Sequence, residues 1–360
     1  MSIDPSSDTP LYQQISEDLR RQIRSGALPT GTRLPPIRQL TTLYGVSIIT
    51  INKALASLVS DGLVDSHVGR GTFVSPLPES LKPRVIGFVL RDLASPFFTR
   101  VAEGAQKRAE AEGFEIFVTS SAGQTSREDA HIARFSSLGA DALIVASLRP
   151  SAPVMRRLRQ ADIPVVMVSH TEADDVPFVG TDPRQAAALA VEHLVSLGHR
   201  RLGFVNGWPG RPSGAQLREG FLDALQRLGI QHEPEFEWNY PHAGSGERHQ
   251  YRSGYAVGQL VAESPDRPEA VLVFNDLGAM GFIDALLDRS VSVPGDVAVV
   301  GIDGIEQGAR ARVPLTSIRQ PAQRIGELAV EMLLKRLRGE SIPMRQFLQP
   351  ELVVRKSSGA

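Results

Sequence analysis

Polar and aromatic side chains recur directly after short apolar runs in the last three quarters of this 360-residue chain. The residues at these positions are Asp92, Ser95, Phe97, Phe98, Ser147, Ser169, His170, Trp208, Asn275 and Asp303. Carboxylates, amides and hydroxyls form directional hydrogen bonds, and aromatic faces cover the apolar side of a ring. Any one of these side chains could instead end a strand or cap a helix, but the set predicts a site for a small, hydroxyl-rich ligand.

No arrangement of residues suited to catalysis stands out in the sequence. The chain has no cysteine, and its histidines, such as those of "HAGSGERH" at 242–249, have neither metal-ligand spacing nor a partnering carboxylate. Lysines are scarce and none follows a strand in a loop suited to an aldimine, and "HVGRGTF" lacks the lysine of a phosphate-binding loop. We therefore expect no enzyme activity, no cofactor and no metal, and we interpret the histidines as solvated or capping side chains.

A different chemistry is indicated by residues 45–74, "GVSIITINKALASLVSDGLVDSHVGRGTFV". Apolar residues spaced three or four apart predict the buried face of a helix. The residues of this face are Ile51, Ala54, Leu55 and Leu58. The residues of the opposite face are Ile48, Ile49, Asn52 and Lys53. Two adjacent isoleucines on an exposed helix start are costly unless something covers them, and thymine methyl groups in the major groove of DNA would do so.

The neighbouring residues suit contacts with the DNA backbone and with base edges. Ser47, Thr50 and Asn52 can donate hydrogen bonds to phosphates or bases, and a helix N-terminus favours a phosphate oxygen. The tip Gly69-Arg70-Gly71 of a predicted hairpin carries one arginine, which can enter a minor groove. Residues 10–75 contain seven basic residues, Arg33 and Arg38 among them, against four acidic ones, although the whole chain carries a net charge of only −1. The positive charge is therefore local.

Helices of predictable length position these residues. The segment "PLYQQISEDLRRQIRSGAL" places apolar residues four apart and predicts one amphipathic helix. The segment "PIRQLTTLYG" predicts a shorter helix that begins at Pro36 and ends at Gly45, after which Ser47 caps the next helix. Two helices joined by a glycine-containing turn and followed by a hairpin predict an α+β winged helix-turn-helix domain over residues 1–75.

The rest of the chain has a different sequence pattern, in which short apolar runs alternate with helical stretches. The runs are "RVIGFVL", "EIFVTS", "ALIVAS", "PVVMVS", "RLGFVNG", "AVLVFND" and "VAVVGID". Continuous apolar strands between helices predict parallel sheets covered on both faces, here an α/β domain of two lobes over residues 85–360. Ligands of such sheets bind beyond the carboxyl ends of the strands. The proline-rich "SPLPESLKPR" before the first run predicts a linker over residues 76–84.

The first domain resembles the winged helix of GntR-type bacterial transcription regulators. The matching motifs are P-L-Y-x-Q-I, G-x-R-L-P, R-x-L, G-V-S-x-x-T, A-L-x-x-L, G-L-V and G-x-G-T-F-V. The resemblance implies that Arg38 contacts phosphate, that residues 47–50 read bases and that Gly69 approaches a minor groove. The family often has arginine after the serine of G-V-S where this chain has Ile48, so an operator sequence does not carry over from relatives.

The second domain resembles the effector domain of LacI/GalR regulators, which shares its fold with periplasmic sugar-binding proteins. The matching segments are "IGFVLRDLASPFF", "EHLVSLGHRRLGFV", "REGFLDAL", "FNDLGAMG", "VPGDVAVVGID" and "PLTSIRQP". The resemblance implies that Phe97 and Phe98 wall the ligand, that Asn275 and Asp303 bind its hydroxyls, and that Gln320 lies at the hinge side of the cleft. It also implies three crossings between the lobes, near Thr181, Val313 and Pro343. The N-lobe is then about 85–181 with 314–342, and the C-lobe is about 182–313 with 343–360.

Three polar anchors of sugar-binding relatives are altered in this chain. Ser95 stands where those relatives commonly have asparagine, and Ser169-His170 stands where they often have Asp-Arg. Leu217 stands at the usual arginine position, and Arg218, one residue later, is turned by about 100° on a helix. We still expect Arg218 in the site, but a modified sugar or a non-sugar effector remains open.

The pairing of a GntR-type domain with a LacI-type domain resembles the architecture of the arabinose repressor. It implies a ligand-responsive transcription regulator that reads an inverted repeat as a homodimer, and that acts as a repressor released from its operator by a sugar or sugar derivative. The helix from Phe97 to Gly113 is a candidate dimer interface. An activator or a solute-binding protein of the same fold is the alternative, although export would need a signal peptide that the start "MSIDPSSDTPLYQQ" lacks.

Composition agrees with this interpretation. With 42% hydrophobic and 22% charged residues, and no apolar run near the ~18 residues that a bilayer requires, the sequence indicates a globular protein without membrane spans. The absence of cysteine favours a reducing cytoplasm. The identity of the effector, the operator and the direction of the response are not fixed by the sequence.

Overall fold

The computed structural model describes residues 9–24, 27–67, 70–75, 84–146, 151–169, 175–208, 212–241 and 247–359. The chain divides into two compact units, Met1–Pro83 and Arg84–Ala360. This division follows the boundary between the two predicted domains. The predicted linker lies outside the described residues except for Arg84, which begins the first strand of the second unit.

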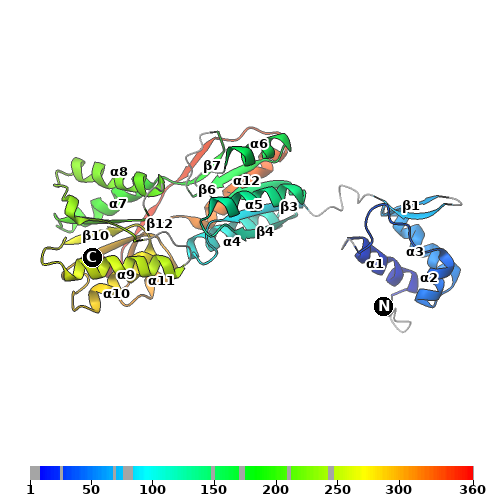
Figure 1. Ribbon diagram of the computed structural model, residues 1–360, viewed down its shortest axis with the longest axis horizontal. Helices are drawn as coiled ribbons and strands as arrows, with labels where there is room; N and C mark the ends of the chain where they lie inside the picture. Colours follow the sequence, from blue (N-terminus) through cyan, green and yellow to red (C-terminus); the bar gives the residue numbers. More distant parts are fainter. Residues whose placement is uncertain are drawn as a thin grey trace. The chain divides into compact units, whose positions relative to one another are not determined.

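The first unit consists of three helices and a hairpin (Figure 1). The helices are α1 (Leu11–Arg24), α2 (Ile37–Tyr44) and α3 (Ile48–Ser60), and the hairpin strands are β1 (Val64–His67) and β2 (Gly71–Val74). Gly45 ends α2 with a φ of +65°, a left-handed conformation that glycine adopts without steric cost. The axes of α2 and α3 therefore bend by 109° at this turn, within the range of a helix-turn-helix.

The apolar faces predicted for α1 and α3 form the core of this unit. Ile15, Leu19, Ile51 and Leu58 are almost fully buried and pack in one cluster with Leu40 of α2. Residues 31–34 run beside β2 as a third extended segment, because the amide of Leu34 donates to the carbonyl of Thr72 over 2.8 Å. Among the described helices, none alone is long and apolar enough to span a membrane, and only the bent pair of α2 and α3 meets that criterion when taken together.

The second unit has two lobes, each built on a six-stranded sheet (Figure 1). The N-lobe sheet has the order β13-β7-β6-β5-β3-β4 and is parallel throughout. Its strands are β3 (Arg84–Leu90), β4 (Phe114–Ser120), β5 (Ala142–Val145), β6 (Val165–Val168), β7 (Phe178–Thr181) and β13 (Arg345–Leu348). One face is covered by α4 (Pro96–Glu110) and α12 (Ala322–Leu337), and the other by α5 (Thr125–Ser137) and α6 (Ala152–Gln160).

The C-lobe sheet has the order β14-β12-β11-β10-β8-β9, in which only β14 runs antiparallel to its neighbour. Its strands are β8 (Leu202–Asn206), β9 (Glu237–Asn239), β10 (Ala270–Val273), β11 (Ala298–Asp303), β12 (Thr316–Arg319) and β14 (Glu351–Val353). The helices are α7 (Pro183–Ser196) and α8 (Pro212–Arg227) on one face, α9 (Glu247–Glu263) and α10 (Asp276–Leu287) on the other, and the short α11 (Glu306–Ala309). Both lobes thus have the predicted α/β architecture.

The chain crosses between the lobes three times, but two crossings fall later than predicted. The first follows β7 at Thr181, as expected. The run "TSIR" pairs with β11 in the C-lobe before the chain leaves it at Gln320, so the predicted crossing near Val313 is too early. β13 pairs with β7 in the N-lobe, so the last crossing lies after Leu348 and not near Pro343. The N-lobe is therefore 84–181 with 322–348, and the C-lobe 183–319 with 351–359.

Helices pack closely in each lobe through glycines that face a neighbouring backbone. A Cβ atom on Gly326 of α12 would lie 1.9 Å from the carbonyl oxygen of Val101 in α4. In the C-lobe, a Cβ atom on Gly254 of α9 would lie 1.9 Å from the carbonyl oxygen of Gly278 in α10. Since real Cβ atoms do not approach oxygen this closely, these contacts depend on glycine.

Candidate functional site

The N-terminal end of α3 exposes the side chains predicted to read DNA. Ser47 caps the helix, and its hydroxyl accepts the amide hydrogen of Thr50 over 3.2 Å. Ile48 and Ile49 are 53% and 70% exposed, whereas Ile51 is completely buried. Asn52 and Lys53 are exposed on the same helix. The helix therefore has the predicted core face and the predicted outward face.

The first unit carries four exposed basic residues that are predicted to contact DNA. They are Arg33, Arg38, Lys53 and Arg70, and within the described part of the chain none of them forms an ion pair. Arg20 differs, because it pairs with Glu17 and with Asp61. The guanidinium of Arg33 lies against Gly71 of the hairpin, where a Cβ atom would come within 2.7 Å of its Nε. Gly69 lies outside the described residues, and its approach to a minor groove stays a prediction.

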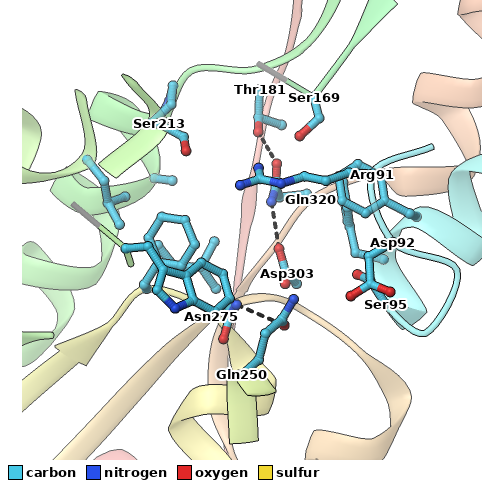
Figure 2. A pocket seen from close by; sticks show the side chains of 18 of the residues that line it. Arg91, Asp92, Ser95, Ser169, Thr181, Ser213, Gln250, Asn275, Asp303 and Gln320 are labelled. Atoms are coloured by element: carbon cyan, nitrogen blue, oxygen red, sulfur yellow. Dashed lines mark hydrogen bonds between the residues drawn. The ribbon is translucent and has the colours of Figure 1, made fainter. Parts of the chain in front are cut away.

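The second candidate site is a cavity at the carboxyl ends of the strands, between the two lobes (Figure 2). The polar residues that line it are Arg91, Asp92, Ser95, Ser169, Thr181, Ser213, Gln250, Asn275, Asp303 and Gln320. The apolar and aromatic residues include Phe97, Phe98, Trp208, Leu217, Phe274 and Ile302. The volume of the cavity that the centres of water molecules can occupy is about 90 Å³, which is several times the volume that one water molecule needs by this measure.

Aromatic rings form opposite walls of this cavity. Phe97 and Phe98 begin α4 and meet edge to face, with ring centroids 5.3 Å apart. Trp208 follows β8 and packs edge to face on the buried Tyr240 at 5.5 Å. Rings fixed in this way present apolar surface without losing freedom when a ligand binds.

A chain of hydrogen bonds links two of the crossings at the cavity. The hydroxyl of Thr181 donates to the side-chain oxygen of Gln320, and the amide nitrogen of Gln320 donates to Asp303 over 2.8 Å (Figure 2). Asp303 has a φ of +118°, an unfavourable value for a residue with a side chain. The surrounding contacts hold its carboxyl group at the cavity despite this strain.

Asn275 is held at the cavity by the start of α10. Its side-chain oxygen accepts the amide hydrogen of Gly278 over 2.9 Å and the hydroxyl hydrogen of Tyr240 over 3.1 Å. Its side-chain nitrogen donates one of its two hydrogens to Gln250 over 3.0 Å. Helix capping and the buried tyrosine thus orient the amide, so that its remaining N–H is available to a ligand.

Two carboxyl groups of the C-lobe lie near one another at this wall, the fully buried Asp276 and the partly exposed Asp303. Burial raises the pKa of Asp276 to about 7, although hydrogen bonds from the hydroxyl of Ser317 and the amide of Ile305 act in the opposite direction. The pKa of Asp303 is raised well above its ordinary value by burial and by the neighbouring Asp276. Both shifts favour the neutral acid over the carboxylate.

One cavity hydroxyl has no partner of its own. Ser213, in the first turn of α8, is only 2% exposed, and its Oγ forms no hydrogen bond within the described residues. A buried hydroxyl without a partner costs free energy, so this position is prepared for a polar group from outside the chain.

Most of the predicted ligand residues come together in the structure. Nine line the cavity, namely Asp92, Ser95, Phe97, Phe98, Ser169, Trp208, Asn275, Asp303 and Gln320. Ser147 and His170 lie outside the described residues. The prediction for Arg218 is wrong, because its guanidinium turns away to pair with Glu237 at 2.5 Å while Leu217 faces the cavity. That the nine residues bind an effector stays a prediction.

The sequence reasoning missed four polar residues of the cavity. Arg91 directly follows the first apolar run, as its neighbour Asp92 does, so its position in the sequence is itself a signal for the cavity. Thr181 ends a strand of four residues that was not predicted. Ser213 and Gln250 lie in the first turns of helices, and only the folded chain brings these turns to the cavity.

Comparisons with known proteins agree with the division into two domains. Residues 11–74 match the bacterial regulatory proteins of the gntR family, and residues 191–358 match a periplasmic binding protein-like domain. The arabinose metabolism transcriptional repressor of Geobacillus stearothermophilus is 27% identical over 362 residues, which cover 97% of this chain and 98% of the relative.

Two solved structures resemble the second unit in fold. The transcription regulator GntR from Chromobacterium violaceum is 25% identical with a TM-score of 0.70, covering 77% of this chain and 100% of that one. A LacI family transcriptional regulator from Lactobacillus casei with bound sucrose is 28% identical with a TM-score of 0.65, covering 76% of this chain and 99% of that one.

Proposed function

We infer that this chain, which joins a gntR-family winged helix-turn-helix domain to a periplasmic-binding-protein-like domain, is a transcriptional repressor controlled by a small ligand. The observation that carries this conclusion is the presence, in one chain, of an exposed helix start, of exposed cations that form no ion pair among the described residues, and of a polar cavity with aromatic walls. A relative that matches nearly the whole chain is a named repressor of arabinose metabolism. We propose a regulatory role and not a catalytic one.

The DNA contacts follow from the first unit. The start of α3 enters the major groove, where Ile48 and Ile49 cover thymine methyl groups and Asn52 reaches a base edge. Arg38 and Lys53 contact phosphates, and Arg70 at the hairpin tip enters the adjacent minor groove. Two copies of the chain read an inverted repeat as a homodimer in the cytoplasm.

The effector is a sugar or sugar derivative that binds in the cavity. Hydroxyl and amide groups alternate there with aromatic rings, and a structural relative holds sucrose. A ligand that contacts both lobes stabilises their closed arrangement, because it interacts with that arrangement more strongly than with the open one. The resulting change in the distance between the two winged helix-turn-helix domains of the dimer releases the operator.

The test is fluorescence polarisation with labelled DNA from upstream of the gene that encodes this chain. Salt is held fixed, since phosphate contacts make affinity depend steeply on ionic strength. We expect tight, sequence-selective binding that one sugar from a panel abolishes. Selective binding that a sugar strengthens would indicate the opposite response, and an absence of selective binding would contradict the function.

A reporter gene behind the same DNA separates a repressor from an activator of the same fold. Deleting the regulator raises expression in the first case and lowers it in the second. A solute-binding protein, the remaining alternative, would leave expression unchanged.

A further inference from the structure

The cavity contains one basic side chain among its described lining residues, and that side chain is Arg91. It directly follows β3, and Figure 2 shows it extending across the cavity. Arg91 is half-buried, and within the described part of the chain its guanidinium forms neither an ion pair nor a hydrogen bond. A guanidinium that carries five N–H donors and has lost part of its hydration gains free energy when it meets an anion.

The carboxyl groups of the cavity do not balance this charge. Asp303 accepts a hydrogen bond from Gln320 at 2.8 Å, and burial raises its pKa, which favours the neutral acid. Asp92 accepts the amide hydrogen of Ala94 over 3.0 Å, and Figure 2 shows it in a different part of the cavity from the Arg91 guanidinium. Within the described residues, neither carboxyl group of the cavity forms an ion pair with Arg91.

A second, independent feature favours the same kind of group. Ser213, in the first turn of α8, presents a buried hydroxyl that has no hydrogen-bond partner within the described residues. The free N–H groups of a helix start carry partial positive charge and attract anions. Ser213 and the Arg91 guanidinium both lie in the upper part of the view in Figure 2. A donor with no partner, a helix start and a free guanidinium together suit an anionic oxygen group.

We propose that the ligand of this cavity is a polyhydroxy compound with a carboxylate or phosphate group. Arg91 binds this anionic group through two parallel hydrogen bonds, and Ser213 donates a hydrogen bond to one of its oxygens. This proposal rests on the proposed function of the cavity as the effector site. The amides of Asn275 and Gln320 and the aromatic walls then serve the neutral, hydroxylated part of the ligand.

The test uses isothermal titration calorimetry on the full chain with matched pairs of sugars. The pairs are glucose with gluconate, galactose with galacturonate, and ribose with ribose 5-phosphate, so that carboxylates and phosphates are probed separately. We expect the acidic member of at least one pair to bind about tenfold more tightly than its neutral partner. Arg91→Gln should then weaken the acidic ligand about 10- to 100-fold and the neutral one less than about twofold. The affinity of Arg91→Lys for the acidic ligand should lie between those of the parent protein and Arg91→Gln, because lysine keeps the charge but cannot form two parallel hydrogen bonds.

The control variant is Arg127→Gln, on the exposed surface of α5 and outside the cavity, which should change no affinity. The proposal is overturned if neutral sugars bind as tightly as acidic ones, if Arg91→Gln weakens both members equally, or if none of the acidic sugars binds. Operator binding without ligand is measured on the same preparations. Its loss would contradict the proposed function, while its retention with release by a neutral sugar would contradict only the present proposal.

Discussion

The two exposed isoleucines at the start of α3 give the clearest residue-level test of DNA reading. Replacing Ile49 by alanine removes apolar surface that is 70% exposed in the free protein, so the fold should lose little stability. If the side chain covers a thymine methyl group, the operator should be bound about tenfold more weakly. Fluorescence polarisation with the operator, beside chemical denaturation of the same variant, measures both quantities.

Val59 offers the matched control near the other end of the same helix, since its side chain is 43% exposed. Val59→Ala should leave operator affinity unchanged. An equal loss of operator affinity in both variants would mean that the effect is not specific to Ile49, and would contradict its contact with a thymine methyl group.

The buried carboxyl of Asp276 predicts a pH dependence of stability. Because burial raises its pKa to about 7, the folded protein keeps a proton that the unfolded chain loses above pH about 4. The free energy of unfolding should therefore fall as pH rises through the interval from about 4 to 7. In Asp276→Asn, which has no such proton, the decrease between pH 5 and 7.5 should be smaller by about 2 kcal/mol.

Urea denaturation of the two proteins at both pH values measures this difference. Asp223→Asn, on the exposed side of α8, serves as control and should follow the parent protein. Parallel pH profiles of Asp276→Asn and the parent would show that Asp276 is ionised in the folded state.

The site residues that could be predicted are those at the carboxyl ends of apolar strands. Asp92 follows β3, Asn275 follows β10 and Asp303 ends β11, and the carboxyl ends of parallel strands meet at one edge. Helical residues were harder to assign, because a shift of one position turns a side chain by about 100°. This is why Leu217 lines the cavity and Arg218 pairs with Glu237 outside it.

At the scale of elements, the crossing of α4 and α12 in the N-lobe depends on Gly326. Gly326→Ala would push a methyl group to within 1.9 Å of the carbonyl oxygen of Val101, so the helices must separate. We expect a loss of about 2 to 3 kcal/mol in the free energy of unfolding, measured by urea denaturation.

Gly308 in α11 provides the comparison, because a Cβ atom there would meet its nearest neighbour at 3.4 Å, an ordinary contact. Gly308→Ala should change stability by less than about 0.5 kcal/mol. A similar loss of unfolding free energy in both variants would mean that the effect comes from replacing glycine in the backbone and not from the contact between the helices.

The elements that the sequence analysis identified are those with a long periodic or apolar pattern. Seven apolar runs became strands, whereas β7, β9, β12, β13 and β14 were missed. The missed strands have three or four residues, as do the identified β5, β6 and β10, but those at the sheet edges carry mixed sequences such as "EWN" and "RQFL". Pairing with a neighbouring strand, and not local preference, makes these segments extended. The misplaced lobe crossings follow directly from the missed β12 and β13.

At the scale of the whole molecule, the chain is a DNA-reading unit and a ligand-binding unit that divide at residue 83. A fragment of residues 84–360 should therefore fold and bind the effector with an affinity within about twofold of the full chain. It should bind no operator, because α3 and the hairpin are absent. Calorimetry and fluorescence polarisation measure the two properties, and a fragment that folds but has lost the effector would show that the cavity depends on the first unit.

The three crossings also determine when each part of the protein can be complete. The N-lobe sheet lacks β13, and its core lacks α12, until the segment up to Leu348 has been synthesised. The DNA-reading unit leaves the ribosome first and can fold while the rest is still being translated. A nascent chain therefore passes through a stage in which the DNA-reading unit is folded and the ligand-binding unit is still incomplete. A chain that ends before residue 316 lacks β12, α12 and β13, so neither lobe of its ligand-binding unit is complete.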